Sequence, residues 1–124
     1  MKTTTVILES LGTPNLNNHV YTKECIEKVI ASIKEPLLII RGIPSNIDFC
    51  VNLTDVCGVV ENIRIEDDRL IAEVEALEIN GYPEMFEQLN KTLFIRPNGV
   101  GVISDDGIVS DYKFTSFTPT MTPA

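Results

Sequence analysis

Alternating apolar and polar positions dominate the stretch Val56–Leu77 and predict one long β-hairpin at the centre of the chain. A period of two is typical of a strand with one buried face. In the second arm the expected buried residues are Leu70, Ala72, Val74 and Ala76. In the first arm, Val59, Ile63 and Ile65 are expected to share one face. The polar run Glu66–Arg69 predicts the turn, because aspartate side chains bond to nearby backbone groups.

A period near 3.6 residues follows Thr22 and predicts an amphipathic helix. Thr22 suits the N-cap position, and Glu24 places a negative charge in the first turn, where it favours the helix dipole. Pro36 is expected to end the helix. The predicted apolar stripe comprises Ile26, Val29, Ile30 and Ile33. A second, short helix is predicted from Pro83 to about Lys91.

Apolar and β-branched runs predict four further strands: Thr3–Glu9, Leu37–Ile40, Leu93–Ile103 and Ile108–Phe117. Leu93–Ile103 is interrupted at Arg96–Gly99, and Asp105–Gly107 predicts a tight hairpin turn. The segment Ile47–Leu53 is ambiguous between loop and strand. In the last strand, Val109, Asp111, Lys113 and Thr115 are expected on one face, and Ser110, Tyr112, Phe114 and Ser116 on the other.

The elements together predict one α+β domain over residues 1–124, with a frayed tail over residues 118–124. Its expected architecture is a mainly antiparallel curled sheet or small β-barrel with two short flanking helices. Eighteen acidic residues against ten basic ones give a net charge of −8, which disfavours binding to nucleic acid or an anionic membrane. It allows a basic protein partner. The N-terminus is too polar for a signal peptide, and no apolar run approaches a membrane span, so we expect a protein that is not secreted.

Side chains suited to catalysis are few. His19 is the single histidine, so a Ser–His–Asp or Cys–His system could use only that residue. The acidic pairs Asp67–Asp68 and Asp105–Asp106 coincide with predicted hairpin turns and match no calcium-binding loop. Three cysteines without a second Cys/His pair do not predict a zinc site. We therefore expect neither a metal nor a cofactor.

Several segments, taken in order, carry a family resemblance over about residues 10 to 124. They are N-L-N-N-H-V-Y before the first helix, a strand ending in G-I-P at 42–44, the hairpin at 56–77, R-P-N-G-V-G at 96–101 with the closing hairpin, and S-F-T-P at 116–119. This series resembles the tailed-phage prohead maturation proteases, whose fold is similar to that of herpesvirus assemblin. The corresponding family motifs include N-x-N-x-R-x-Y, G-H-P, S-S-R-G-x-G around the catalytic serine, and S-F-D-x-V-x-x-P-S.

Two departures from the family pattern lie at the positions of the family's catalytic residues. Ile43 stands where G-H-P has the catalytic histidine. Aligning the glycines puts Arg96 at the serine, and a shift of one residue would put Ile95 there. None of these side chains can serve as an acyl-transfer nucleophile or a general base. The resemblance therefore implies a protease fold whose catalytic positions are replaced, and we expect no enzymatic activity.

Three functional hypotheses follow. The first is a non-enzymatic phage protein, located in the virion or host cytoplasm, that binds a capsid or other virion protein as an auxiliary, decoration or assembly protein; the resemblance also implies homo-oligomers. The second is a small acidic inhibitor of a host enzyme or defence protein, and the third is an active serine-type peptidase arranged around His19. The predicted binding residues are Ile43, Ile47, Phe49, Val51, Asp67, Asp68, Asp105 and Asp106.

Overall fold

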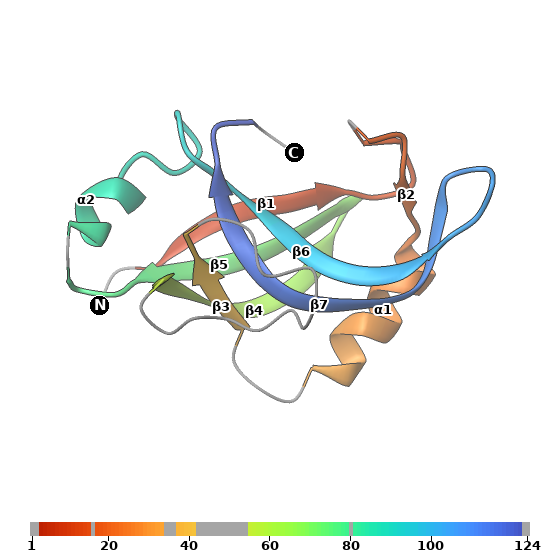
Figure 1. Ribbon diagram of the computed structural model, residues 1–124, viewed down its shortest axis with the longest axis horizontal. Coiled ribbons are helices and arrows are strands. Elements are labelled where there is room, and N and C mark those ends of the chain that lie inside the picture. Colours follow the sequence, from red (N-terminus) through yellow and green to blue (C-terminus); the bar gives the residue numbers. More distant parts are fainter. Residues whose placement is uncertain (1–2, 16, 34–36, 42–54, 80, 123–124) are drawn as a thin grey trace.

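The computed structural model shows a curled sheet with a short helix near each end, which confirms the predicted α+β class (Figure 1). It describes residues 3–15, 17–33, 37–41, 55–79 and 81–122. The strands are β1 (Thr4–Ser10), β2 (Val20–Tyr21), β3 (Leu37–Ile40), β4 (Val56–Glu66), β5 (Arg69–Ala76), β6 (Phe94–Ile103) and β7 (Ile108–Thr120). The helices are α1 (Lys23–Ser32) and α2 (Tyr82–Phe86).

The sheet has the strand order β1-β5-β4-β3-β7-β2, and β6 pairs with β7 outside this path. Most pairs are antiparallel, as predicted, whereas β2 and β3 run parallel to β7. The curl brings β1, at one end of the order, close to β6 (Figure 1). This arrangement is that of a half-barrel, with β1 and β6 on either side of its opening.

The core fills the inside of the curl. Its largest fully buried side chains include Phe117, Leu8, Ile26, Ile39 and Leu70. The helix α1 presents its apolar stripe to this core, where Ile26 and Val29 are buried. The hydroxyl of Thr22 accepts a hydrogen bond from the backbone N–H of Cys25 at 3.1 Å, which confirms the predicted N-cap.

A bulge in β4 changes which residues of the central hairpin face the core. The pairing shifts between Glu61 and Arg64, so the alternation along β4 changes phase at that point. Val60 is therefore buried, and Val59 lies on the other face from Ile65. The expectation that Val59 shares a face with Ile63 and Ile65 is wrong, because a strict period of two contains no extra residue.

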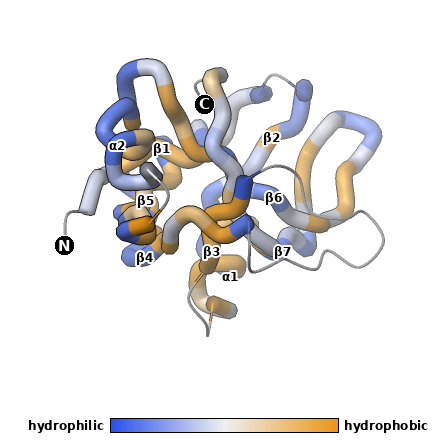
Figure 2. Tube along the Cα trace, turned by 60° about the vertical axis from the view of Figure 1, so that its left-hand side comes forward, coloured by the Kyte–Doolittle hydropathy of each residue, from blue (hydrophilic) through white to orange (hydrophobic). Residues whose placement is uncertain are grey.

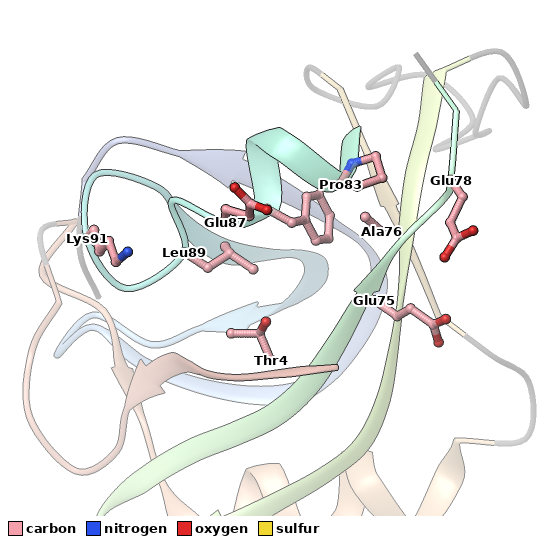
Figure 3. A pocket seen from close by; sticks show the side chains of 9 residues that line it. Thr4, Glu75, Ala76, Glu78, Pro83, Glu87, Leu89 and Lys91 are labelled. Atoms are coloured by element: carbon pink, nitrogen blue, oxygen red, sulfur yellow. The ribbon is translucent and has the colours of Figure 1, made fainter. Parts of the chain in front are cut away.

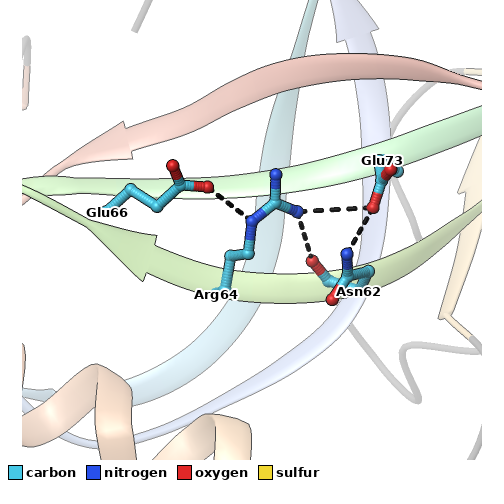
Figure 4. A network of polar contacts seen from close by, with 4 residues as sticks. All are labelled: Asn62, Arg64, Glu66 and Glu73. Atoms are coloured by element: carbon cyan, nitrogen blue, oxygen red, sulfur yellow. Dashed lines mark hydrogen bonds and ion pairs between the residues drawn. The ribbon is translucent and has the colours of Figure 1, made fainter.

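A polar network holds this bulge on the outer surface of the hairpin (Figure 4). The guanidinium of Arg64 donates to Glu66 at 2.5 Å, to the backbone oxygen of Asn62 at 3.0 Å and to Glu73 at 3.4 Å. The Asn62 amide also donates to Glu73. Asn62 has a positive φ of 53°, a conformation that asparagine tolerates better than most residues.

Bulges in β7 correct two further expectations. Asn98 pairs with Ser116 and the next residue, Gly99, pairs with Phe114, so Thr115 is an extra residue in β7. A second extra residue lies near Asp111. Phe114 and Ser116 consequently lie on opposite faces, although the alternation predicted one face for both. β7 also continues to Thr120, so residues 118–120 of the expected frayed tail are paired with β6.

Candidate functional site

The strand pair β6–β7 carries Arg96, the residue that the family resemblance aligns with the catalytic serine. In the register of this pair, Arg96 lies opposite Thr118 and Asn98 lies opposite Ser116. Directly opposed residues of an antiparallel pair project from the same face of the sheet. We call Arg96, Asn98, Ser116 and Thr118 the polar row.

Asn98 organises the polar row through its side-chain amide. Its Nδ2 donates to Thr118 Oγ1 at 2.6 Å and to Ser116 Oγ at 3.1 Å. The backbone oxygen of Asn98 accepts a hydrogen bond from Thr115 Oγ1 at 3.2 Å. Ser116 is 0% exposed and Thr118 is 5% exposed, whereas Arg96 is exposed. The row thus places a guanidinium at the surface above two buried hydroxyls.

A nucleophilic serine needs a base within hydrogen-bond reach to take its proton. In the polar row the group beside the Ser116 hydroxyl is an amide, which cannot accept that proton. His19 lies near the other end of β7, since the next residue, Val20, pairs with Ile108. Because β7 contains two bulges, it advances by only about six strand positions between Ile108 and Ser116, which corresponds to roughly 20 Å. His19 is therefore too far away to activate Ser116.

A groove of about 440 Å³ runs along the opening between β1 and β6 and includes Arg96. Its charged residues are Glu9 and Arg96, and its other lining residues are Leu8, Ser10, Thr13, Pro14, Asn15, Asn17, Ile95, Thr120 and Thr122. Burial raises the pKa of the Glu9 carboxyl, and hydrogen bonds from the Ser10 backbone and Asn15 partly oppose this shift. The groove, which we call the β1–β6 groove, offers apolar walls, polar loop groups and one charge of each sign. A groove beside an unpaired strand edge can take an extended protein segment.

The predicted acidic turns lie at one end of the molecule, where both contact the segment 11–23. The backbone oxygen of Asp68 accepts from Leu11 N–H at 2.8 Å, and the Asp68 carboxylate pairs with Lys23 at 2.9 Å. In the other turn, Gly107 accepts from Val20 N–H at 2.7 Å. The residues Asp67, Asp68, Asp105 and Asp106 are all exposed. Their shared end was not foreseeable from turn composition, because it depends on long-range contacts of the segment 11–23.

The remaining predicted binding residues, Ile43, Ile47, Phe49 and Val51, lie outside the described residues, as does the ambiguous segment 47–53. The strand that precedes Ile43 in the sequence is β3, which pairs with β7 at Ile39↔Phe117. The described end of β3 is thus adjacent to the strand that carries half of the polar row.

A second hollow, of about 430 Å³, lies between the helix α2 and the end of β5 (Figure 3). Glu75 and Glu78 lie on one side of it and Lys91 on the other, with Leu89 between them (Figure 3). Sequence reasoning missed this hollow, because its lining comes from β1, β5 and the chain around α2.

Within the described ranges no group of three His, Cys, Asp or Glu side chains is placed to hold a metal ion. None of the helices found there is long and apolar enough to cross a membrane.

The half-barrel is similar in fold to a known phage assembly protease. A solved structure with this fold is that of the bacteriophage T4 capsid assembly protease, gp21, which superposes with a TM-score of 0.79. The match covers 98% of this chain and 82% of that chain at 17% sequence identity, so it establishes similarity of fold. The sequence matches no protein-family model and no curated protein.

Proposed function

We propose that this chain is a non-enzymatic phage protein that uses an assembly-protease-like fold to bind a capsid or other virion protein. In this role it acts as an auxiliary, decoration or assembly protein. The observation that carries the proposal is the polar row: the hydroxyls of Ser116 and Thr118 are buried and bonded to an amide, and the residue that the resemblance aligns with the catalytic serine is an exposed arginine. The similarity of fold to a capsid assembly protease supports the capsid as the source of the partner.

The proposed binding site is the β1–β6 groove. Arg96 lies at its edge with an exposed side chain, and Leu8 and Ile95 supply buried apolar walls. A guanidinium forms strong, two-pronged hydrogen bonds with carboxylates, so it favours an acidic group on the bound segment. The groove would thus hold a segment of a virion protein without cleaving it.

Catalysis and binding require separate tests. For catalysis, the purified protein is incubated with a fluorophosphonate probe and with a mixed peptide library, and intact mass and cleavage are measured. We expect no labelling and no cleavage. Labelling that disappears on mutating one serine, accompanied by loss of cleavage, would show an active peptidase and overturn the proposal.

For binding, immobilised protein is exposed to disassembled virion proteins of the phage that encodes it, and retained proteins are identified by mass spectrometry. We expect retention of a shell protein by the wild type and loss of retention with Arg96→Glu. Arg69→Glu is the matched control, because it makes the same charge change at an exposed arginine outside the groove. Equal retention by the two variants would remove the groove from the proposal.

A second candidate, the inhibitor of a host enzyme, is favoured by the acidic turns that meet at one end of the molecule. Charge-driven association with a basic surface weakens as salt rises. A host protein that is retained from lysate at low salt, is released at high salt and is lost with Asp105→Asn/Asp106→Asn would support this candidate over the first.

A further inference from the structure

The strand β6 has one paired and one unpaired edge. It pairs with β7 along its length, and no other described strand pairs with it. Both register shifts of this pair place the extra residue in β7, so the alternation of β6 continues without interruption from Phe94 to Ile103. An exposed, regular edge of this kind presents free N–H and C=O groups to another strand.

The outer half of β6 is also apolar on its exposed face. Val100 is 38% exposed and Val102 is 57% exposed, and these valines share a face because they are two residues apart. Figure 2 shows hydrophobic colour on both arms of the β6–β7 hairpin, next to a hydrophilic tip. Exposed apolar residues on an edge strand mark a site for association.

The opposite face of this half-strand is closed by an aromatic side chain. A Cβ atom at Gly99 would clash with the ring of Tyr112 and lie 2.5 Å from the backbone oxygen of Lys113. Tyr112 packs edge-on against Tyr21, with ring centroids 5.2 Å apart. Glycine therefore permits the ring to cover this face, which leaves the valine face and the backbone edge for a partner.

We propose that two copies of this chain associate through their β6 edges, antiparallel about a twofold axis at Gly101. In this register Val100 of each copy lies opposite Val102 of the other copy. The two contacts together form one cluster of four valines. Residues 97–104 contain no charged side chain, so no like charges oppose one another across the new strand pair. A twofold interface of this type is self-complementary and closes at two copies.

Charge complementarity identifies the occupant as a second copy. Arg96 lies five positions before Gly101 and Asp106 lies five positions after it, so the twofold axis brings the arginine of each copy to the acidic turn of the other. Within one chain the eight residues of β6 from Arg96 to Ile103 already span about 23 Å, so the two charges cannot pair. Among the described residues, the ion pairs do not include Arg96 or Asp106.

This inference goes beyond the proposed function, and its test measures self-association in the absence of any virion protein. Sedimentation velocity and light scattering are run over the soluble concentration range at low salt. We expect a dimer for the wild type and a monomer for Val102→Lys, which puts two extra charges into the valine cluster. Ile79→Lys is the control: Ile79 is 54% exposed and lies outside β6, and this variant should remain dimeric.

The register is tested by exchange of charge. Arg96→Asp and Asp106→Arg should each raise the dissociation constant by about tenfold or more, because each places like charges at both contacts. An equimolar mixture of the two variants should recover dimers, since both contacts are then between opposite charges. A monomeric wild type, an unchanged Val102→Lys dimer, or a mixture no stronger than its components would each overturn the proposal.

Discussion

Replacing Asn98 by alanine removes the donor that serves both buried hydroxyls of the polar row. The Ser116 oxygen is fully buried and loses the bond at 3.1 Å, and the Thr118 oxygen loses the bond at 2.6 Å. A buried polar group left unsatisfied costs about 1–3 kcal/mol. Thr118 makes a further interaction, so most of the cost comes from Ser116. We expect a loss of about 2 kcal/mol in the free energy of unfolding, which corresponds to a Tm lower by about 5–10 °C.

The assay is urea unfolding followed by far-UV circular dichroism, because the chain contains no tryptophan for fluorescence. Asn17→Ala, at an exposed asparagine, is the control and should change stability by less than about 0.5 kcal/mol. The double variant Asn98→Ala/Ser116→Ala removes donor and acceptor together, so it should be less destabilised than the sum of the single variants by about 1 kcal/mol. Additive losses, or an Asn98→Ala protein as stable as the wild type, would refute the energetic role assigned to the polar row.

Three further predictions concern other parts of the fold. Gly99→Ala should lower the free energy of unfolding by about 1–3 kcal/mol, because its Cβ overlaps a tyrosine ring and a backbone oxygen. The closest contact of a Cβ at Gly101 is 3.1 Å, so Gly101→Ala should cause a clearly smaller loss in the same urea assay. Thr22→Ala should lower the free energy of unfolding by about 1 kcal/mol, because the helix loses its N-cap, whereas Thr22→Ser should keep the cap and the stability. Thermal unfolding measures the difference. Burial raises the pKa of the Cys57 thiol to about 11. The free energy of unfolding should therefore be fully present below the unfolded pKa of about 9 and should fall as the pH rises through 11. Cys57→Ala should flatten this pH dependence. At pH 8, mass-spectrometric mapping of alkylation should find Cys25, which is half-buried, modified before Cys57, and the reverse order would contradict this account.

Local patterns in the sequence determined most of the elements. The period-two run of β5 buries Leu70, Ala72 and Val74, as the alternation predicts. Thr22 caps α1, and Gly107 takes the positive φ that the Asp-Gly turn requires. These features depend on residues a few positions apart, so the sequence carries them directly.

The faces of the longer strands were decided by the tertiary structure. The extra residue in β4 near Asn62, and those in β7 near Asp111 and Thr115, change the phase of an alternation that the sequence continues. Whether a strand absorbs an extra residue depends on its partner strand and on the contacts that hold the bulge. The periodicity of one strand contains no information about its partner strand or about the contacts that hold a bulge.

The candidate site also arose from pairing between distant segments. The family resemblance singled out Arg96, but the bonds from Asn98 to Ser116 and Thr118 join residues 18 and 20 positions apart, and only the β6–β7 register places them on one face. The β1–β6 groove likewise requires the sheet to curl until its first strand approaches β6. Local propensity sets where a strand lies in the chain, whereas burial of one shared core sets which strands meet, and the groove and the polar row exist only where they meet.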